Sequence, residues 1–156
     1  MNNELTIRPM QPSDVECVSR IEAECFTMPW SANAFSKVLE DLKSVYLVAE
    51  SEGQIVGMCG LTNILGEGDI NNVAVKDTFR GRGIAYAMLT QLIRLGEAAG
   101  VEEFTLEVRV SNAQAIHVYE KLGFTSEGIR PRFYEKPVED AMIMWRRKMP
   151  AITTEI

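Results

Sequence analysis

Apolar residues recur at intervals of three and four in the first quarter of the chain, which is the spacing of one helix face. In "SDVECVSRIEAECF" this spacing predicts a helix capped by Ser13, with Val15, Val18, Ile21 and Cys25 on one side. Pro29 interrupts the pattern, and a second helix is predicted behind Ser31, with Phe35, Val38, Leu39 and Leu42 on one side. Two helices should therefore flank an aromatic loop, "FTMPW".

Runs rich in β-branched and aromatic residues predict the strands. Leu5 to Arg8 alternates and forms a first strand that Pro9 closes. Glu52 and Gly53 separate "SVYLVAES" from "QIVGMCGLTNI", which is a strong hairpin signal. The remaining strands are Asp69 to Lys76, "EEFTLEVRV", "TSEGIRPRFY" and "DAMIMWRRK".

Two more helices lie between these later strands. Behind Gly83, a helical period places Ile84, Ala87, Met88, Leu92 and Leu95 on one face, and Gly96 and Gly100 weaken and then end the helix. A shorter helix begins behind Ser111 or Asn112 and ends at Gly123. This order of strands and helices predicts a mixed α/β or α+β sheet.

The length of 156 residues, 46% of them hydrophobic, predicts one core and a single domain over residues 1–148, with a frayed tail over 149–156. No run approaches the roughly 18 apolar residues needed to span a bilayer. The start, "MNNELTIRPM", lacks the basic-then-apolar pattern of a secretion signal. We therefore expect a soluble, cytoplasmic protein.

Charge and metal-binding residues exclude several functions. A net charge of −6 disfavours general binding to nucleic-acid phosphates and suits a cationic partner. Cys17, Cys25 and Cys59 are odd in number and lack CxxC spacing, which argues against a disulfide framework and a zinc site. Only one histidine, His117, is present, and we expect it on the surface. We expect no metal cofactor, and buried structural roles for Cys25 and Cys59.

The segment "FRGRGIAYAML" joins a strand to a helix through a basic, glycine-rich turn. Unpaired N–H groups at a helix N-terminus bind anions, and the helix dipole reinforces them. Gly81 and Gly83 let the backbone approach a ligand, while Arg80 and Arg82 add positive charge. The turn is neither a Walker loop nor a dinucleotide fingerprint. Taken alone, it fits a diphosphate site and an ordinary turn with solvated arginines equally well.

Three motifs in order resemble one family. "VAVKDTFRGRGIAYAML", followed by "LEVRVSNAQAIHVYEKLGF", is similar to the GNAT superfamily of acetyl-CoA-dependent N-acetyltransferases. The loop "FTMPWS" and the tail "RPRFYEKPVEDAMIMW" resemble its RimI-type members, which acetylate the N-terminal alanine of a small-subunit ribosomal protein. The resemblance covers roughly Leu5 to Lys148. It implies a mostly antiparallel mixed sheet, flanked by helices and splayed at the acetyl-CoA site.

The resemblance also implies how acetyl-CoA would bind. Backbone groups of Val73, Ala74 and Val75 would contact the acetyl and pantetheine groups, as an added strand does. The diphosphate would lie on the turn and the first helical residues, which are Arg80, Gly81, Arg82, Gly83, Ile84, Ala85 and Tyr86. Asn112 would also reach the cofactor. Core packing of the two valine side chains is compatible with this role.

Two residues carry the chemistry that the resemblance implies. In "EEFTLEVRV", Phe104, Leu106 and Val108 face one side, while Thr105, Glu107 and Arg109 face the other. The resemblance makes Glu107 the proton acceptor, and without it Glu107 would be an exposed strand carboxylate. Tyr119 would donate a proton to the coenzyme thiolate, in direct transfer within a ternary complex, although it also fits a core aromatic position.

The substrate is the least determined part of the prediction. Met28, Pro29 and Trp30, with Phe133 and Tyr134, could form two walls of a groove for a peptide end, or they could close the core. The preferred substrate is a protein N-terminus, most simply that of a basic ribosomal protein. Two alternatives are a GNAT enzyme acting on a small amine or a lysine side chain, and a non-catalytic acyl-CoA sensor. Neither nucleic acid nor membrane is an expected partner.

Overall fold

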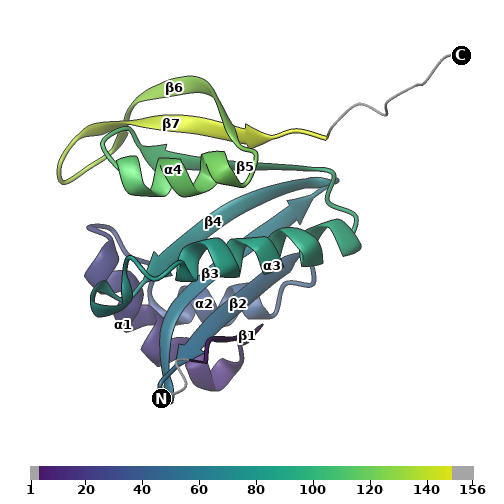
Figure 1. The fold of residues 1–156 in the computed structure, drawn as a ribbon, viewed down its shortest axis with the longest axis vertical. Coiled ribbons are helices and arrows are strands. Elements are labelled where there is room, and N and C mark those ends of the chain that lie inside the picture. Colours follow the sequence, from purple (N-terminus) through teal and green to yellow (C-terminus); the bar gives the residue numbers. More distant parts are fainter. Residues whose placement is uncertain (1–3, 149–156) are drawn as a thin grey trace, which may run out of the picture.

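Seven strands form one mixed sheet in the computed structural model, which describes residues 4–148 (Figure 1). The strands are β1 (Thr6–Pro9), β2 (Ser44–Ser51), β3 (Gln54–Ile64), β4 (Glu67–Val75), β5 (Glu103–Arg109), β6 (Thr125–Tyr134) and β7 (Glu139–Arg146). Their order across the sheet is β1-β2-β3-β4-β5-β7-β6. Only β4 and β5 pair in parallel, so the prediction of a mixed, mostly antiparallel sheet is confirmed.

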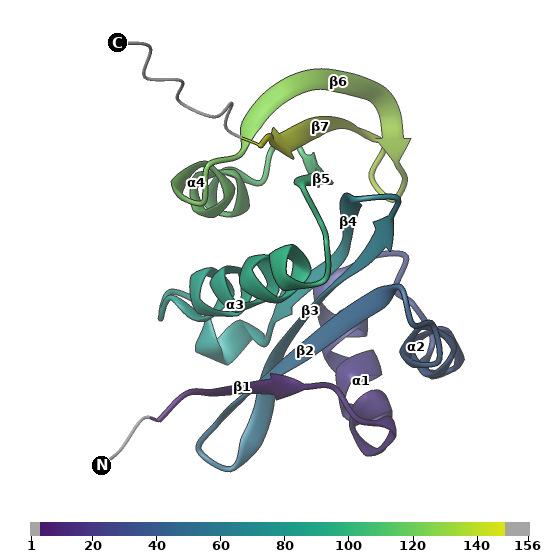
Figure 2. The same ribbon diagram turned by 90° about the vertical axis from the view of Figure 1, so that its right-hand side faces the viewer.

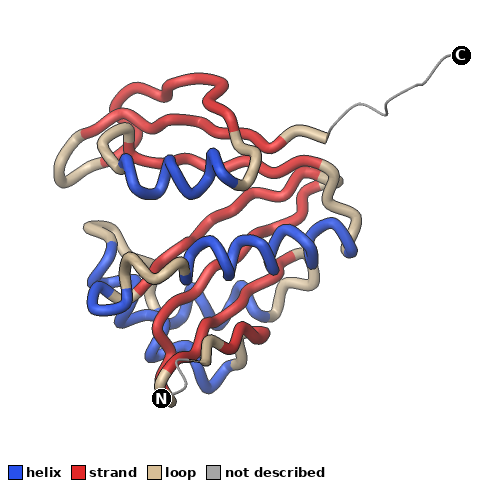
Figure 3. The backbone as a smooth tube through the Cα atoms, viewed as in Figure 1, coloured by secondary structure: helices blue, strands red, loops and turns tan. Residues whose placement is uncertain are grey.

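Helices cover both faces of this sheet (Figures 2 and 3). One face carries α1 (Val15–Cys25) and α2 (Ala32–Leu39), and the other carries α3 (Ile84–Ala98) and α4 (Ala113–Lys121). Two short 3-10 turns, η1 (Pro12–Asp14) and η2 (Asp77–Phe79), precede α1 and α3. The helices give each face its own buried cluster, built around Phe104, Leu61 and Met88 under α3 and around Phe35, Val48 and Met58 under α1 and α2.

The sheet divides between β4 and β5. Their parallel ladder consists of three pairs, Glu67 with Glu103, Gly68 with Phe104, and Asp69 with Thr105. Gly68 permits this close approach, because a Cβ there would lie 2.9 Å from Val101 and 3.1 Å from the Phe104 ring. Asn71 is then an extra residue opposite β3, and such a bulge bends a strand. Beyond Asp69, the two strands no longer pair, and an edge of β4 is left open inside the sheet.

Local signals in the sequence agree with the structure where they concern turns and caps. The side chains of Ser31 and Asn112 accept backbone N–H groups at 3.2 Å at the starts of α2 and α4, as predicted. The β2–β3 hairpin turns at Glu52 and Gly53, both with positive φ. Gly123, with φ of +91°, follows the end of α4. These residues act through their nearest neighbours, which explains why the sequence alone locates them.

Other boundaries were wrong. Ser13 does not cap α1, because η1 precedes the helix and Asp14 takes the N-cap position. Pro9 belongs to β1 and pairs with Leu47, which an edge strand tolerates because one side of its backbone needs no partner. Leu42 lies beyond the end of α2 and is fully exposed. β4 begins at Glu67, two residues before the predicted start. The predicted tail, residues 149–156, lies outside the described residues.

Candidate active site

The open edge of β4 presents two of the three predicted backbone residues. The N–H of Lys76 donates to the carbonyl of Val56 on β3 at 2.7 Å. Bonded and non-bonded pairs alternate along antiparallel strands, so the peptide groups of Ala74 also face β3. Those of Val73 and Val75 therefore face away from β3, toward the divided part of the sheet. Their side chains pack against the cluster under α3, so backbone exposure and core packing coexist.

The glycine-rich turn connects β4 to α3. Gly81 and Gly83 have φ of +78° and +76°, a left-handed backbone that L-residues adopt with strain. A Cβ at either position would meet no atom within 4 Å, so conformation rather than crowding requires glycine here. Gly83 is the N-cap of α3 and offers no side chain to satisfy the helix N-terminus. The turn thus keeps its backbone accessible.

Three N–H groups at the start of α3 have no acceptor one turn earlier within the helix. They belong to Ile84, Ala85 and Tyr86, the residues that the resemblance assigns to the diphosphate. The Ile84 side chain is buried in the core and fixes the first turn, whereas Tyr86 is 44% exposed. The macrodipole adds partial positive charge at this end, so the geometry suits an anion.

The two arginines of the turn make separate local contacts. Arg80 Nε donates to the Val75 carbonyl at 3.4 Å, on the open edge of β4. The Arg82 guanidinium lies 4.6 Å from the centroid of the Phe79 ring. Both side chains are about half exposed, so either could turn toward an incoming anion at small cost in contacts.

Glu107 lies on β5 just past the point where β4 and β5 separate. Its side chain retains 32% of its exposure, and Oε1 is 3.7 Å from a guanidinium nitrogen of Arg130 on β6. Burial raises the pKa of Glu107, the nearby charge of Asp69 raises it further, and Arg130 opposes both. The half-buried carboxylate is thus a stronger base than a solvated one, and it has acceptor capacity to spare.

Tyr119 belongs to α4 and is buried, with its ring 5.9 Å from that of Phe124. Burial raises the pKa of its phenol above the ordinary value, and Tyr134 and Cys59 add to the effect. The hydroxyl therefore stays protonated at neutral pH.

Glu107 and Tyr119 approach the division of the sheet from opposite faces. Tyr119 packs in the cluster under α3 and α4 with the inward residues of β5, while Glu107 lies on the other face of the same strand. Asn112 begins α4 nearby, and its side chain is occupied in capping Ala115 N–H. A base on one face and an acid on the other suit a reaction in which two molecules meet across the divided sheet.

The two segments predicted as groove walls meet in the structure. Thr27 Oγ1, in the α1–α2 loop, donates to the Glu135 carbonyl in the β6–β7 turn at 3.2 Å. Met28 is 60% exposed and Phe133 is 41% exposed, and Pro29 is exposed too. Trp30 instead packs on Phe35, with ring centroids 5.3 Å apart, which is the core alternative for that residue.

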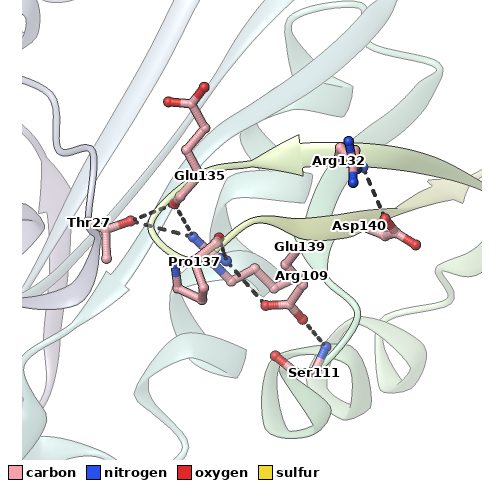
Figure 4. Close-up of polar contacts among 8 residues, drawn as sticks. All are labelled: Thr27, Arg109, Ser111, Arg132, Glu135, Pro137, Glu139 and Asp140. Atoms are coloured by element: carbon pink, nitrogen blue, oxygen red, sulfur yellow. Dashed lines mark hydrogen bonds and ion pairs between the residues drawn. The ribbon is translucent and has the colours of Figure 1, made fainter.

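Arg109, at the end of β5, ties these walls together (Figure 4). Its guanidinium donates to the carbonyls of Glu135 and Pro137 at 3.0 Å each, and one nitrogen lies 3.2 Å from Glu139 Oε1. Glu139 Oε2 also accepts the Ser111 N–H at 2.8 Å, ahead of α4. The guanidinium carbon is 4.5 Å from the centroid of the Tyr134 ring, and burial raises the pKa of that phenol to about 12. The Tyr134 phenol therefore stays neutral, with its ring held against Arg109.

A buried polar network beneath the α1–α2 loop was not predicted. Glu22 is 2% exposed, and its carboxylate accepts the Trp30 N–H at 2.9 Å and the Asn72 amide at 3.2 Å. Asn72 Oδ1 in turn accepts the Tyr46 hydroxyl at 2.8 Å. The sequence did contain a signal for this network, because Glu22 stands four residues after Val18 and therefore on the apolar face of α1. This network fixes the loop relative to β4.

The cysteines agree only partly with their predicted role. Cys59 is buried, and burial raises the pKa of its thiol, as expected of a structural cysteine. Cys25 is half-buried instead, because it ends α1 beside the open edge, where its sulfur lies 3.4 Å from both the Val75 carbonyl and Arg80. His117 is exposed as predicted.

Within residues 4–148, no group of three or more His, Cys, Asp or Glu side chains is placed to hold a metal ion. None of the helices in this range combines the length and apolar character needed to cross a membrane.

The chain is similar in sequence and in fold to known acetyltransferases. The family model described as Acetyltransferase (GNAT) family matches residues 15–124. A Bacillus subtilis protein, provisionally named ribosomal protein bS18-alanine N-acetyltransferase, is 35% identical over 93% of this chain and 97% of its own length. The crystal structure of the ribosomal-protein-S18-alanine N-acetyltransferase from Escherichia coli has a TM-score of 0.85 at 29% identity, covering 98% of this chain and 100% of that one.

A more distant structure shares the fold alone. The Salmonella typhimurium protein yncA, provisionally an acetyltransferase, was determined with its cofactor acetyl-CoA and has a TM-score of 0.83 at 18% identity. It covers 97% of this chain and 98% of its own length. Together these likenesses confirm the fold class and the family resemblance drawn from the sequence.

Proposed function

The chain belongs to the acetyltransferase (GNAT) family and is an N-acetyltransferase, and from this premise we propose that it acetylates the α-amine at a protein N-terminus. The names of its Bacillus and Escherichia relatives specify an alanine of ribosomal protein bS18 or S18. The proposed substrate is therefore the N-terminal alanine of that small-subunit ribosomal protein. The acetyl group passes directly from acetyl-CoA to the amine in a ternary complex. The observation that best supports this proposal is the placement of Glu107, as a base, and Tyr119, as an acid, on opposite faces of the divided sheet.

The open edge of β4 and the turn after it support acetyl-CoA as the donor. The peptide groups of Val73 and Val75 face the division, where a pantetheine amide can pair with them as another strand would. The free N–H groups at the start of α3, with Arg80 and Arg82, would hold the diphosphate. The continuous segment from Val73 to Tyr86 would therefore supply hydrogen-bond donors and acceptors for both the pantetheine and the diphosphate of acetyl-CoA.

Glu107 and Tyr119 supply the proton transfers. An α-amine has a reference pKa of roughly 7.7 to 8.0, so a carboxylate with a raised pKa is adequate as its base near neutrality. Glu107 accepts a proton from the amine, which then attacks the thioester carbonyl. As the carbon–sulfur bond breaks, the neutral phenol of Tyr119 protonates the departing thiolate. The Cys25 sulfur contacts the Val75 carbonyl and the Arg80 guanidinium, neither of which can take the thiol proton, so a covalent acetyl-cysteine route lacks support.

The bridged walls favour a chain terminus over an internal side chain. Thr27, Glu135 and Arg109 connect the α1–α2 loop to the β6–β7 turn, and exposed Met28 and Phe133 lie on either side. An extended terminus can enter such an arrangement end-on, whereas an internal lysine brings chain on both sides of the reacting residue. Lysine also has a reference pKa of roughly 10.4, which demands a stronger base. Acetylation of a small amine or a lysine side chain is the alternative function.

A peptide panel tests the proposal. Purified protein is given acetyl-CoA and short peptides that differ only in their first residue, including the alanine-initial peptide, and acetylation is followed by mass spectrometry. The same reaction is run with polyamines and with an N-terminally blocked lysine peptide. We expect alanine-initial peptides to have the highest kcat/KM. Faster acetylation of the blocked lysine peptide or of a polyamine would replace the proposed function with the alternative.

A further inference from the structure

One arginine contacts both groove walls, the α1–α2 loop and the β6–β7 turn. The Arg109 guanidinium carries two N–H groups on each terminal nitrogen, and each of the four has an acceptor (Figure 4). Nη1 donates to the Pro137 carbonyl at 3.0 Å and to Glu139 Oε1 at 3.2 Å. Nη2 donates to the Glu135 carbonyl at 3.0 Å and to Thr27 Oγ1 at 3.4 Å. The contacts therefore use the flat fork of a guanidinium, which a lysine ammonium lacks.

Two of these acceptors flank a strained residue in the β6–β7 turn. Lys136 has φ of +55°, a left-handed conformation that residues with a Cβ adopt at a cost. Arg109 binds the carbonyls on both sides of it, those of Glu135 and Pro137. A strained backbone persists only where its surroundings hold it in place. The shape of this turn therefore depends on a side chain that comes from another strand.

The strand that carries Arg109 also carries the proposed base. Glu107 and Arg109 are two residues apart on β5, so their side chains leave the same face of the sheet. The backbone fixes their separation along the strand at about 7 Å. Because Arg109 holds the β6–β7 turn, it sets the position of that turn relative to the Glu107 carboxylate.

The same arginine is linked to the helix that carries the proposed acid. Glu139 accepts from Arg109 through Oε1 and accepts the Ser111 N–H through Oε2 at 2.8 Å. The Asn112 N–H donates to the Arg109 carbonyl at 2.9 Å, and Asn112 is the N-cap of α4. Hydrogen bonds from Ser111 and from Arg109 lower the pKa of Glu139, so its carboxylate is charged at neutral pH. The start of α4, the helix of Tyr119, is thereby tied to the groove walls.

We propose that Arg109 is a positioning residue for acetyl transfer, which holds the two groove walls in register with Glu107 and Tyr119. This inference rests on the proposed function, because it concerns a peptide substrate. The peptide residues after the first lie between the walls, so the position of the walls decides where the α-amine stops. A displacement of about 1 Å can lower a reaction rate roughly a hundredfold. Through Arg109, contacts with the later residues of the peptide bring the nitrogen to the position where it reacts.

Substrate length gives the test. kcat and KM are measured with alanine amide, which ends after its first residue, and with alanine-initial peptides of two, three and six residues. In the wild type, kcat/KM should rise at least about tenfold from the amide to the six-residue peptide, because binding of remote parts of a substrate supports reaction at its reacting centre. Arg109→Lys keeps the charge but loses the fork, and should reduce this rise at least about fivefold.

The division of the loss between kcat and KM distinguishes positioning from simple binding. A peptide that binds between displaced walls holds its amine away from the thioester, so kcat for the six-residue peptide should fall in Arg109→Lys. A loss confined to KM would make Arg109 a binding contact only and would overturn the positioning role.

The matched control is Arg147→Lys. Arg147 also holds a carboxylate through two nitrogens, with Nε and Nη2 at 3.0 and 2.6 Å from the oxygens of Glu127, and its guanidinium carbon lies 3.9 Å from the centroid of a Trp145 ring. It follows β7 at the end away from the β6–β7 turn. The same substitution there should change the rise with peptide length by less than about twofold.

A second variant alters the walls and leaves the arginine in place. The Thr27 hydroxyl donates to the Glu135 carbonyl and accepts from Arg109, and Thr27→Val removes that hydroxyl from an exposed position in the α1–α2 loop. The rise with peptide length should fall about threefold, as expected for the loss of a hydrogen bond. Thr27→Ser, which keeps a hydroxyl, should retain most of the rise.

The outcomes separate this inference from the proposed function. If the wild type acetylates alanine-initial peptides but shows no rise with length, or if the rise survives in Arg109→Lys and Thr27→Val, the inference fails and the function stands. If the wild type prefers a polyamine or the blocked lysine peptide, the function fails and takes the inference with it. Thermal unfolding and acetyl-CoA titration check the fold of each variant. Should Arg109→Lys not fold, the comparison of Thr27→Val with Thr27→Ser decides.

Discussion

Glu22 and Glu107 are two glutamates whose pKa is raised by burial, yet their surroundings differ in one decisive respect. Glu22 is 2% exposed, and its oxygens accept hydrogen bonds from Trp30 and Asn72. Glu107 retains 32% of its side-chain exposure, and its ion pair to Arg130 is 3.7 Å long. The first carboxylate has its hydrogen-bonding capacity used inside the protein, whereas the second keeps capacity for a substrate.

Two tyrosines repeat the contrast. Tyr46 and Tyr119 are both buried, and burial raises the pKa of both phenols. The Tyr46 hydroxyl donates to Asn72 within the buried network, while Tyr119 stands beside the divided sheet. A raised pKa therefore does not by itself identify a catalytic group in this protein. The hydrogen-bond partners distinguish the residues that hold the fold from those proposed to act on substrate.

The largest expected effect separates the two glutamates by turnover. Glu107→Gln should lower kcat about 10²–10⁴-fold, the range typical of a lost general base, and leave acetyl-CoA affinity nearly unchanged. Glu22→Gln should change kcat less than about threefold, because an amide oxygen still accepts the Trp30 N–H. Steady-state kinetics with an alanine-initial peptide measures both. Equal losses in the two variants would remove the distinction.

Stability should separate the same residues in the opposite order. Glu22→Ala leaves the Trp30 N–H and the Asn72 amide buried without their acceptor, so we expect a loss of about 2–3 kcal/mol in the free energy of unfolding. Glu107→Ala, at a half-exposed position with one long ion pair, should change it by less than about 0.5 kcal/mol. Urea unfolding reports both values. A large loss at Glu107 would show that it is structural.

The tyrosines provide a smaller, matched effect. Tyr119→Phe should lower kcat roughly tenfold, about 1.4 kcal/mol in activation free energy, with little change in stability. Tyr46→Phe removes a buried hydrogen bond to Asn72 and should cost about 1 kcal/mol of stability with little change in kcat. Parallel kinetics and unfolding of the two variants measure the contrast. An unchanged rate in Tyr119→Phe would exclude the phenol as the acid.

The smallest expected effect concerns pH. Because burial raises the pKa of Glu22 in the folded state, the folded protein binds its proton more tightly than the unfolded chain does. Stability should then fall as pH rises from the ordinary glutamate value, roughly 4.3, through the raised folded value. Glu22→Gln removes this dependence. Unfolding free energies measured across the window for both proteins should diverge as pH rises, and parallel curves would contradict the assignment.

Sequence reasoning succeeded where a residue acts on its immediate neighbours. Ser31, Asn112 and the Glu52–Gly53 turn were located correctly, because a cap or a tight turn is decided within four residues. It failed where a distant element decides the outcome. Cys25 has the right spacing for the apolar face of α1, but it is half-buried because it lies beside the open edge of β4.

The candidate site divides in the same way. The glycines and arginines of the turn stand together in sequence, and Glu107 and Tyr119 were assigned through family resemblance. The sequence analysis missed Asp69, Glu22 and Asn72. The spacing of residues within one strand or helix does not show which charged and amide side chains of other elements will lie beside them. Only the last pair of the β4–β5 ladder brings Asp69 beside Thr105 and onto the same face of the sheet as Glu107.

The amino-acid order by itself determined which segments are helices and strands, the caps at Ser31 and Asn112, and the glycine-rich turn before α3, because each depends on local sterics and nearby hydrogen bonds. Only the tertiary structure decided that β4 and β5 part after three pairs and that the α1–α2 loop meets the β6–β7 turn. It also decided that the Glu22 carboxylate is fully hydrogen-bonded inside the protein while the Glu107 carboxylate is not. The first two outcomes depend on contacts between residues 36 and 108 positions apart, and the Glu22–Asn72 hydrogen bond joins residues 50 positions apart. The energies of these contacts exist only when the packed sheet brings the residues together.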